Sequence, residues 1–454
     1  MNRIALMFAL FLAIAPGARA QLLEDESVFK AGFASVDITP EASVPMWGYG
    51  KEHRPENNST GVLDLLYAKA LVLEAGKTRA ALVGLDLGRA PFEPMVRRIE
   101  QAVLRQAGVQ HIFLVGSHTH HGPALELVPV EGNTDSALQN AFAYYEQLEE
   151  KLIGVIVEAA GRLVPAKIGW ASAESQVNRN RHTQEAPVPR DPELFTLRAD
   201  DLEGKPIAIM VNFAAHPTNH PHGDNKFSAD YPGVMMAAVQ EATGAPCMFL
   251  QGAAGDMQCD VDDSQWGKVE QMVEPGQQLA REVLALNATL TTAAPARPDL
   301  RGERASFSFN LRLDLNDPAV TEGMRAEFGE SLHQSYKTKY ADGLMHPKLT
   351  TLLLNGELAI AGGSGEFFSD HSVQLKKRVD GVKTIFVGYC NGHDMYFPTL
   401  RAIDQGGYGA DPASAWVTPG GPEKMIDRAV FSIRDLVKQT QPVVPAAATA
   451  EPPK

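Results

Sequence analysis

Histidines, carboxylates and tyrosines follow several apolar segments of this 454-residue chain, and these residue types can bind metal ions or transfer protons. His118, His120 and His121 lie within four residues. In an extended segment alternate side chains point to the same side, so His118 and His120 could reach one metal ion or one substrate. His216 follows another apolar segment, directly before Pro217. The spacing favours a metal site over a surface turn.

Further candidates stand in other loops, namely Asp256, Glu366, Tyr396 and Tyr408. Each has a structural explanation when taken alone: Asp256 could cap a turn, and Glu366 could stabilise the first turn of a helix. Together with the histidines they resemble a zinc site, because zinc binds imidazole and carboxylate and a catalytic site keeps a position for water. A surplus histidine could carry protons. The pattern therefore predicts a metal-assisted hydrolase.

Buried strands must position these loops, and the hydrophobic pattern predicts several of them. Two strand–helix–strand units are expected, each with a helix that begins near a proline. Asn355-Gly356 between two apolar runs is a strong hairpin signal. The predicted strands are 80–86, 111–115, 206–213, 247–250, 305–313, 350–354, 358–361 and 383–387, and the predicted helices begin at Pro91 or cover 231–242, 264–287 (interrupted at Pro275 and Gly276), 370–379 and 422–438.

These elements predict an α/β protein with a mixed, partly parallel sheet flanked by helices. Ligands of open α/β sheets bind outside the carboxyl ends of the strands, and the candidate residues follow those ends. Residues 291–304, with Pro295 and Pro298, are expected to be a connector. We expect one catalytic domain over residues 21–440 and place the active site at the strand ends.

The charge and the cysteine content exclude nucleic-acid-binding proteins and cysteine-rich zinc modules. The formal net charge is −14, with no basic run long enough to follow a phosphate backbone, so nucleic acid is not an expected partner. Only Cys247, Cys259 and Cys390 occur, too few for a cysteine-rich zinc module. Any metal must therefore bind nitrogen and oxygen ligands. Cys247 and Cys259 could pair in an oxidising compartment, which would leave Cys390 free.

Both ends of the chain differ from its middle. Arg3, the apolar run 4–15 and the triplet Ala18-Arg19-Ala20 have the shape of a signal peptide over residues 1–20. The protein is therefore expected to be exported, periplasmic or secreted. Residues 441–454 are rich in proline and alanine and are expected to form a disordered tail.

The motifs together resemble the neutral/alkaline non-lysosomal ceramidases. Asp37-Ile38-Thr39-Pro40 and the later Gly48-Tyr49-Gly50 are similar to the start of that family's catalytic domain. The family's His-Thr-His-Ser-Gly-Pro motif appears as residues 118–123, with His121 in place of serine. Further matches, in the family's order, are His216-Pro217-Thr218, Gly223-Asp224-Asn225-Lys226, Ser364-Gly365-Glu366-Phe367, and Asn391 with Tyr396 and Tyr408.

The resemblance implies a role for each matched residue. Zn²⁺ would be held by His118, His216, Glu366 and Tyr396. His120 would transfer a proton, and Asp256 lies in a catalytic motif. Tyr408 and an arginine would bind the substrate carbonyl. Arg179 follows Asn178 as in the family's Asn-Arg pair, although neighbouring Arg181 leaves the choice of arginine open.

The implied reaction is hydrolysis of N-acylsphingosine (ceramide) to a fatty acid and a sphingoid base by zinc-bound water. The family's Gly-Asp-x-Ser motif reads Gly255-Asp256-Met257-Gln258 here, which is compatible with attack by water but not by serine. The chain ends 46 residues after Tyr408, so no C-terminal immunoglobulin-like domain is expected. Alternatives are the same chemistry on another N-acyl amide, ester or lactone, and a non-catalytic periplasmic lipid-binding protein. The expected partner is a lipid or N-acyl amide, with peripheral membrane contact and no stable protein partner.

Overall fold

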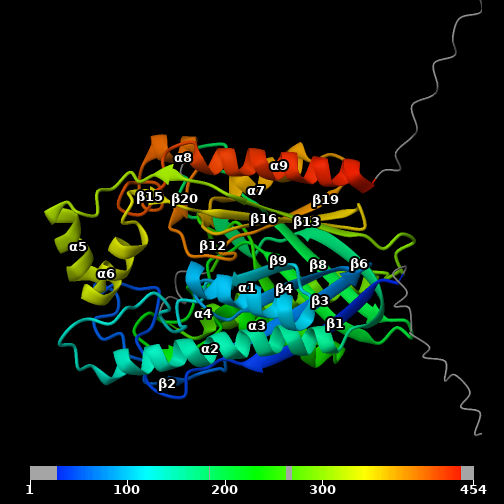
Figure 1. Ribbon diagram of the computed structural model, residues 1–454, viewed down its shortest axis with the longest axis horizontal. Helices are drawn as coiled ribbons and strands as arrows, with labels where there is room; N and C mark the ends of the chain where they lie inside the picture. Colours follow the sequence, from blue (N-terminus) through cyan, green and yellow to red (C-terminus); the bar gives the residue numbers. More distant parts are fainter. Residues whose placement is uncertain (1–27, 184, 262–267, 441–454) are drawn as a thin grey trace, which may run out of the picture.

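The computed structural model describes residues 28–183, 185–261 and 268–440, which fold into layers of helices and two sheets (Figure 1). The predicted signal peptide and the predicted tail lie outside these residues. No helix in the described ranges combines the length and apolar character that crossing a membrane requires. The chain is an α/β protein with a mixed sheet flanked by helices, as expected.

The larger sheet has eight strands and combines antiparallel with parallel neighbours. Its order is β11 (Cys247–Gln251), β9 (Pro206–Phe213), β8 (Glu193–Asp201), β6 (Val164–Glu174), β1 (Lys30–Asp37), β3 (Tyr67–Ala75), β4 (Thr78–Leu85) and β5 (His111–Gly116). The pairs β4–β5 and β9–β11 are parallel, and the others are antiparallel. Both parallel pairs come from the strand–helix–strand units that the sequence predicts.

The smaller sheet has four strands, in the order β13 (Leu300–Ser306), β16 (Lys348–Leu354), β17 (Leu358–Gly363) and β19 (Lys383–Val387). The β16–β17 hairpin turns at Asn355 and Gly356, whose φ angles are 54° and 70°, as the Asn-Gly signal predicts. Four short pairs complete the strands: β2 (Gly61–Val62) with β10 (Lys226–Phe227), β7 (Asn178–Asn180) with β12 (Met257–Cys259), β14 (Phe309–Asn310) with β15 (Leu344–Met345), and β18 (Glu366–Phe367) with β20 (Tyr396–Phe397).

Helices cover the outer faces of both sheets (Figure 1). The larger sheet carries α1 (Glu93–Ala107), α2 (Ser136–Gly161), α3 (Asp230–Thr243) and α4 (Glu270–Thr289), and the smaller sheet carries α7 (Ser369–Arg378) and α9 (Gly421–Thr440). Three shorter helices are α5 (Pro318–Phe328), α6 (Glu330–Lys339) and α8 (Leu400–Gln405). The helices leave the inner faces of the sheets to pack on each other.

Alternation along β3 shows why both of its faces are apolar. Leu71 and Leu73 belong to the core between the two sheets, whereas Ala70 and Val72 belong to the core beneath α1 and α2. Successive strand residues point to opposite faces, so a strand covered on both sides is a continuous apolar run. Leu352 and Ile360 complete the core from the smaller sheet.

Close backbone contact brings the two parallel pairs together although they lie toward opposite ends of the strand order. A Cβ atom added to Gly84 in β4 would lie 2.4 Å from the carbonyl oxygen of Phe249 in β11. Glycine therefore allows the strands to approach. At the end of β11 the Gln251 Nε2 donates to the carbonyl oxygens of Ser117 and Ala215, at 2.8 Å each. The loops after β5 and β9 are thereby joined.

Three expectations about secondary structure were wrong. Residues 300–304, expected in a connector, belong to β13, which pairs with β16 and ends at Ser306 rather than running through 305–313. The helix expected over 264–287 is α4, and Pro275 lies inside it without interrupting it. Gly276 packs on α3, since a Cβ there would lie 2.8 Å from the Tyr231 carbonyl oxygen. Tertiary packing outweighs the local cost of proline.

The three cysteines are buried free thiols, so the pairing of Cys247 with Cys259 that the sequence allows is not formed in this structure.

Candidate active site

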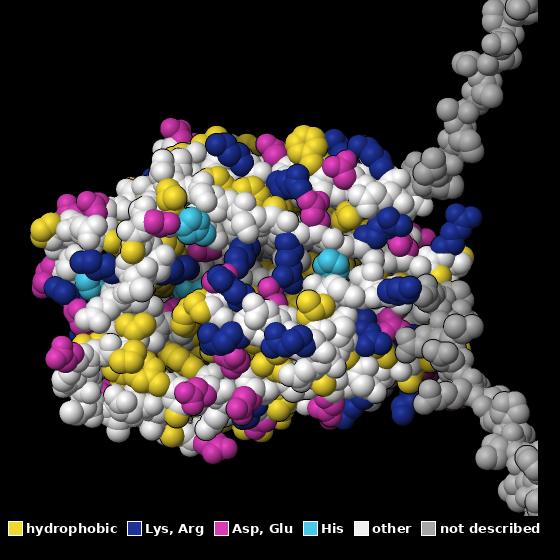
Figure 2. Space-filling model, viewed as in Figure 1, with side chains coloured by type: hydrophobic (Ala, Val, Ile, Leu, Met, Phe, Trp, Pro, Cys, Tyr) yellow, Lys and Arg dark blue, Asp and Glu magenta, His cyan; other side chains and the backbone are white. Residues whose placement is uncertain are grey.

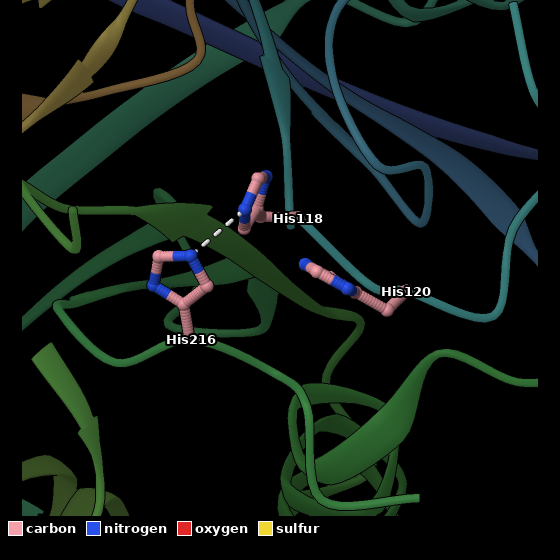
Figure 3. Close-up of side chains that lie close together, drawn as sticks. All are labelled: His118, His120 and His216. Atoms are coloured by element: carbon pink, nitrogen blue, oxygen red, sulfur yellow. Dashed lines mark hydrogen bonds between the residues drawn. The ribbon is translucent and has the colours of Figure 1, made fainter. Parts of the chain in front are cut away.

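Side chains from separate strand ends meet in one place. His118 and His120 lie in the loop after β5, and His216 lies in the loop after β9. Glu366 and Tyr396 are directly paired in the parallel β18–β20 ladder, so their side chains share a face. All five are buried. Figure 3 shows the imidazoles of His118 and His216 facing each other, with the His120 ring pointing toward the same space.

Three acceptor atoms lie within contact distance at the centre of this group. The His118 Nε2 is 3.0 Å from the His216 Nε2 and 3.2 Å from the Glu366 Oε2. The Glu366 Oε2 is 3.4 Å from the His216 Nε2, and the Tyr396 hydroxyl is also 3.4 Å from that nitrogen. The structure therefore brings together the four side chains expected to hold zinc.

The hydrogen bonds of the two ring Nδ1 atoms determine which nitrogen faces the centre. The His118 Nδ1 donates to the Gly88 carbonyl oxygen at 2.8 Å, and the His216 Nδ1 donates to the Ala254 carbonyl oxygen at 2.6 Å. In neutral rings both Nε2 atoms then carry a lone pair. His118 is held with φ at 72°, an uncommon conformation for a residue other than glycine. The backbone thus contributes to aiming the ring.

The pKa shifts keep the acceptors in a state that binds metal. Burial lowers the pKa of His118, and it lowers that of His216 to about 3, with a further contribution from Arg181. Burial alone would raise the pKa of Glu366, but His118, His216 and Arg89 bring it well below its usual range. Neutral imidazoles and an ionised carboxylate are the forms that coordinate zinc.

A cation between these atoms would resolve an otherwise unfavourable arrangement. Two lone-pair nitrogens and a carboxylate oxygen face one another in a buried space, and the Glu366 Oε2 has no hydrogen-bond donor. Such groups repel one another, and a metal ion would stabilise them together with the Arg181 Nη2, which lies 2.9 Å from the His216 Nε2. The ring nitrogens of His118, His120 and His216 also lie within 4.8 Å of one another. The donor set fits a zinc ion, although the identity of the ion stays a prediction.

His120 differs from the other two histidines because neither of its buried ring nitrogens has a hydrogen-bond partner. Its ring packs against Trp47 and Tyr49, with a centroid separation of 4.7 Å from each. A Cβ at Gly48 would lie 2.5 Å from the ring, so glycine makes room for it. Both nitrogens are left for a substrate, water or metal, which suits the expected proton transfer.

Arg181, and not Arg179, is the arginine at the site. Arg179 is exposed and pairs with Asp260 at 3.2 Å. Gln258 lies opposite Arg179 in the β12–β7 ladder. Strand β7 ends at Asn180, and the chain turns there so that the Arg181 amide donates to the Asp256 carbonyl oxygen.

The Arg181 guanidinium reaches the centre of the site. Its Nη2 donates to the Tyr396 hydroxyl at 3.0 Å and to the Gly255 carbonyl oxygen at 3.1 Å, and it lies 2.9 Å from the His216 Nε2. Of the two arginines that the sequence leaves open, the structure places Arg181 beside the centre of the group and Arg179 away from it, because the turn after β7 separates the two side chains.

Asp256 is close to the site without touching its centre. Its carboxylate accepts from the backbone amide of Ser369 at 2.6 Å, from the Ser369 hydroxyl at 3.0 Å and from Asn180 at 2.7 Å. Burial raises its pKa to about 6. Asp256 thus fixes the start of α7, just after Glu366, and the segment before Arg181. The contacts of its carboxylate are those of a positioning residue, and the catalytic role expected from the motif stays a prediction.

Tyr408 stands at the outer edge of the site. Its side chain is 69% exposed, and its hydroxyl lies 3.5 Å from that of Tyr396. The guanidinium of Arg181 lies 6.0 Å from the centre of the Tyr408 ring. A substrate carbonyl could therefore meet Tyr408 and Arg181 together, as expected for a carbonyl-binding pair.

Arg89 was missed by the sequence analysis, although it too follows a buried strand. It stands after β4, its Nη2 donates to the Glu366 Oε1 at 3.0 Å, and its Nη1 lies 2.7 Å from the His393 Nε2. The first bond turns Glu366 so that its other oxygen faces the histidines. Glu126 in turn pairs with His393 and accepts from Trp47 at 3.0 Å. The sequence analysis selected polar residues that follow predicted buried strands, and the same criterion would also have selected Arg89 after the strand predicted over 80–86.

A cavity of about 690 Å³ leads to these residues. His118, His120, Glu366, Tyr396 and Tyr408 line one part of it. Side chains from α5, α6 and their neighbourhood form an apolar wall: Leu313, Val320, Met324, Phe328, Leu332 and Trp416. The cavity is large enough for a ligand of drug size, and its wall suits an alkyl chain.

Known proteins resemble the chain in both sequence and fold. Neutral ceramidase A of Dictyostelium discoideum is 26% identical over 239 residues, which cover 46% of this chain and 32% of that protein. The crystal structure of neutral ceramidase from Pseudomonas aeruginosa matches with a TM-score of 0.71 and 17% identity, covering 91% of this chain and 75% of that one. A ceramidase complexed with C2 gives a TM-score of 0.70, also at 17% identity, covering 94% of this chain and 77% of that one.

No family model matches the chain. The fold is that of the neutral ceramidases, as the motifs predict. The resemblance to that family is thus confirmed by a curated neutral ceramidase and by the solved structures.

Proposed function

We propose that the protein is a zinc-dependent hydrolase of linear amides that cleaves N-acyl lipids of the ceramide type. The observation that carries the proposal is the meeting of His118, His216, Glu366 and Tyr396 at a cavity with an apolar wall. The likeness to neutral ceramidases supports ceramide as the substrate.

Zinc would be held by those four side chains, and when bound it would supply a Lewis acid and lower the pKa of water to near neutrality. Arg89 would hold Glu366 in the orientation that binding requires, through its 3.0 Å hydrogen bond. Asp256 would keep the start of α7, which follows Glu366, in place.

The other residues would act on the substrate itself. Arg181 and Tyr408 would donate to the amide carbonyl oxygen and stabilise the negative charge that develops there. His120 would accept a proton from the attacking water and return it to the leaving nitrogen. The amide C–N bond breaks, a C–O bond to the water oxygen forms, and the products are a fatty acid and an amine. For N-acylsphingosine the amine is the sphingoid base.

The apolar wall would take the acyl chain, and its position also bears on membrane contact. Figure 2 shows hydrophobic side chains gathered at the end of the molecule that carries α5 and α6. Phe328, at the end of α5, is 49% exposed and lines the cavity. This arrangement supports a peripheral contact through which a lipid would enter. Export by the predicted signal peptide 1–20 is part of the proposal.

Metal analysis together with substrate turnover tests the proposal. The purified protein should contain zinc and release fatty acid from N-acylsphingosine, and His118→Ala should lose both. His346→Ala is the matched control, because His346 is 48% exposed and contacts Asp342 and Ser308 at the surface. A protein without zinc whose hydrolysis is unchanged by His118→Ala would contradict the proposal.

Two alternatives to the proposed ceramide hydrolase can be tested with the same purified protein. A panel of short N-acyl amides, esters and lactones, compared with ceramide, would identify another substrate of the same chemistry. Gln258 replaces the serine of the family motif and motivates the third candidate, a lipid-binding protein without activity. Tight lipid binding with no fatty acid released over hours would favour it.

A further inference from the structure

Arg54 lies in the cavity wall as a buried cation without an anionic partner. The residue is 1% exposed and lines the same cavity as His118 and His120. It makes no ion pair with a carboxylate in the part of the chain that the structure describes. Because an unpaired buried charge is costly, arginine is rarely placed in such surroundings without a counter-ion.

Three backbone carbonyls hold the guanidinium but do not use all of its donors. Its Nε donates to the His222 oxygen at 3.3 Å, and its Nη1 donates to the oxygens of Trp47 and His120 at 3.0 and 3.1 Å. The buried Nη2 has no hydrogen-bond partner. Arg54 is thus fixed beside the backbone of His120 with one donor group unused.

Tyr49 adds a second unused donor at the same place. The Arg54 guanidinium lies 4.7 Å from the centre of the Tyr49 ring, and the buried Tyr49 hydroxyl also lacks a partner. Asp224 is the nearby carboxylate, but it lies against Lys226 at 3.3 Å and His220 at 3.4 Å instead of Arg54. The residues around Arg54 therefore offer unused donors and positive charge, and within the described ranges no carboxylate forms an ion pair with the guanidinium.

We infer that Arg54 and Tyr49 form a subsite for an oxyanion on the amine side of the substrate, so that the preferred substrate is an N-acyl amide carrying a carboxylate or a phosphate. This inference rests on the proposed function and deepens it. The acyl chain would occupy the apolar wall near α5 and α6, and the anionic group of the amine portion would receive hydrogen bonds from the Arg54 Nη2 and the Tyr49 hydroxyl. Neutral N-acylsphingosine would leave both donors unused.

Matched pairs of substrates test the subsite. N-dodecanoylglycine is compared with N-dodecanoylglycinamide, and ceramide 1-phosphate with ceramide, which separates carboxylate from phosphate as the source of the charge. Both kcat/KM and the equilibrium dissociation constant are measured. A charged hydrogen bond of about 1.5–3 kcal/mol corresponds to a preference of roughly 10- to 150-fold for the anionic member of at least one pair.

Variants assign that preference to Arg54. Arg54→Met should reduce it at least roughly tenfold, and Arg54→Lys should keep part of it, because charge remains while the planar fork is lost. Lys226→Met removes a 45% exposed cation that is not part of the cavity wall, and it should leave the preference unchanged. If Arg54→Met does not fold, the Lys variant and the wild type still test the idea.

The binding measurement separates this inference from the proposed function. Preference for an anionic ligand that depends on Arg54 would support the subsite, and the same preference with no hydrolysis of any substrate would support the subsite and contradict the hydrolase. Hydrolysis with equal affinity for charged and neutral members would support the hydrolase and overturn the subsite. A preference that Arg54→Lys and Arg54→Met leave unchanged would overturn it as well.

Discussion

Replacing Arg181 tests the assignment of the carbonyl-binding arginine. The Arg181 Nη2 lies within 3.1 Å of the Tyr396 hydroxyl and the Gly255 carbonyl oxygen, and its guanidinium faces the Tyr408 ring. Arg181→Met removes the charge and keeps an apolar stem of similar length. Loss of one donor to a developing oxyanion costs about 3–4 kcal/mol, so kcat should fall roughly 100- to 1,000-fold.

Arg179→Met is the matched control, two residues away. Arg179 is 44% exposed and its partner Asp260 is 59% exposed, so their ion pair is worth about 0–1 kcal/mol of stability at most. The control should keep kcat within about twofold of the wild type, because nothing at the reacting centre depends on this side chain.

The assay measures kcat and KM for N-acylsphingosine together with zinc content and melting temperature. Zinc content separates loss of transition-state stabilisation from loss of the metal, and the melting temperature reports damage to the fold. Arg181→Lys should be intermediate, because it keeps a charge without the fork. The reasoning is refuted if zinc-loaded, folded Arg181→Met retains kcat within about threefold, or if Arg179→Met loses as much activity.

Three further predictions concern stability and the fold. Glu193 lies against Lys376 at 2.9 Å and also pairs with Lys383. Burial would raise the pKa of Glu193, but the two lysines lower it to about 2. The stability that the Glu193 carboxylate contributes is therefore complete above its unfolded pKa of about 4.5 and is lost as the pH falls toward 2. Glu193→Gln should flatten the fall in unfolding free energy over this range by up to roughly 3 kcal/mol, and identical urea curves for the two proteins at pH 3 and pH 7 would contradict this. Ile360→Ala in the core between the sheets should cost about 2–5 kcal/mol in urea unfolding, and a cost below about 1 kcal/mol would show that the sheets are not packed there. Gly84→Ala should lower both the melting temperature and the activity, since its methyl group would meet the Phe249 carbonyl oxygen at 2.4 Å, and an unchanged melting temperature would argue against that contact.

Local pattern predicted much of the secondary structure. Strands 206–213 and 383–387 match β9 and β19 residue for residue, and the Asn355-Gly356 turn forms as expected. These elements are determined by properties that a short segment carries in itself, namely apolar runs and turn residues. The extent of β13 could not be read in this way, because β16, the partner that fixes it, is distant in sequence.

The sequence by itself also determined which residue types meet at the site, since His118, His120, His216, Glu366 and Tyr396 stand in motifs with recognisable spacing. Only the tertiary structure decided their neighbours. Arg181 lies beside the other side chains and Arg179 does not, because the chain turns after β7, and the Asp256 carboxylate lies at the start of α7 because it accepts from the Ser369 amide.

Convergence of the site likewise depends on contacts between distant segments. The approach of β4 to β11 at Gly84 and the two hydrogen bonds from Gln251 join loops that no local pattern relates. The unused donors of Arg54 and Tyr49 are visible only when every surrounding group is in place. Residue type determines what chemistry is available, and long-range packing determines which atoms come within reach of one another.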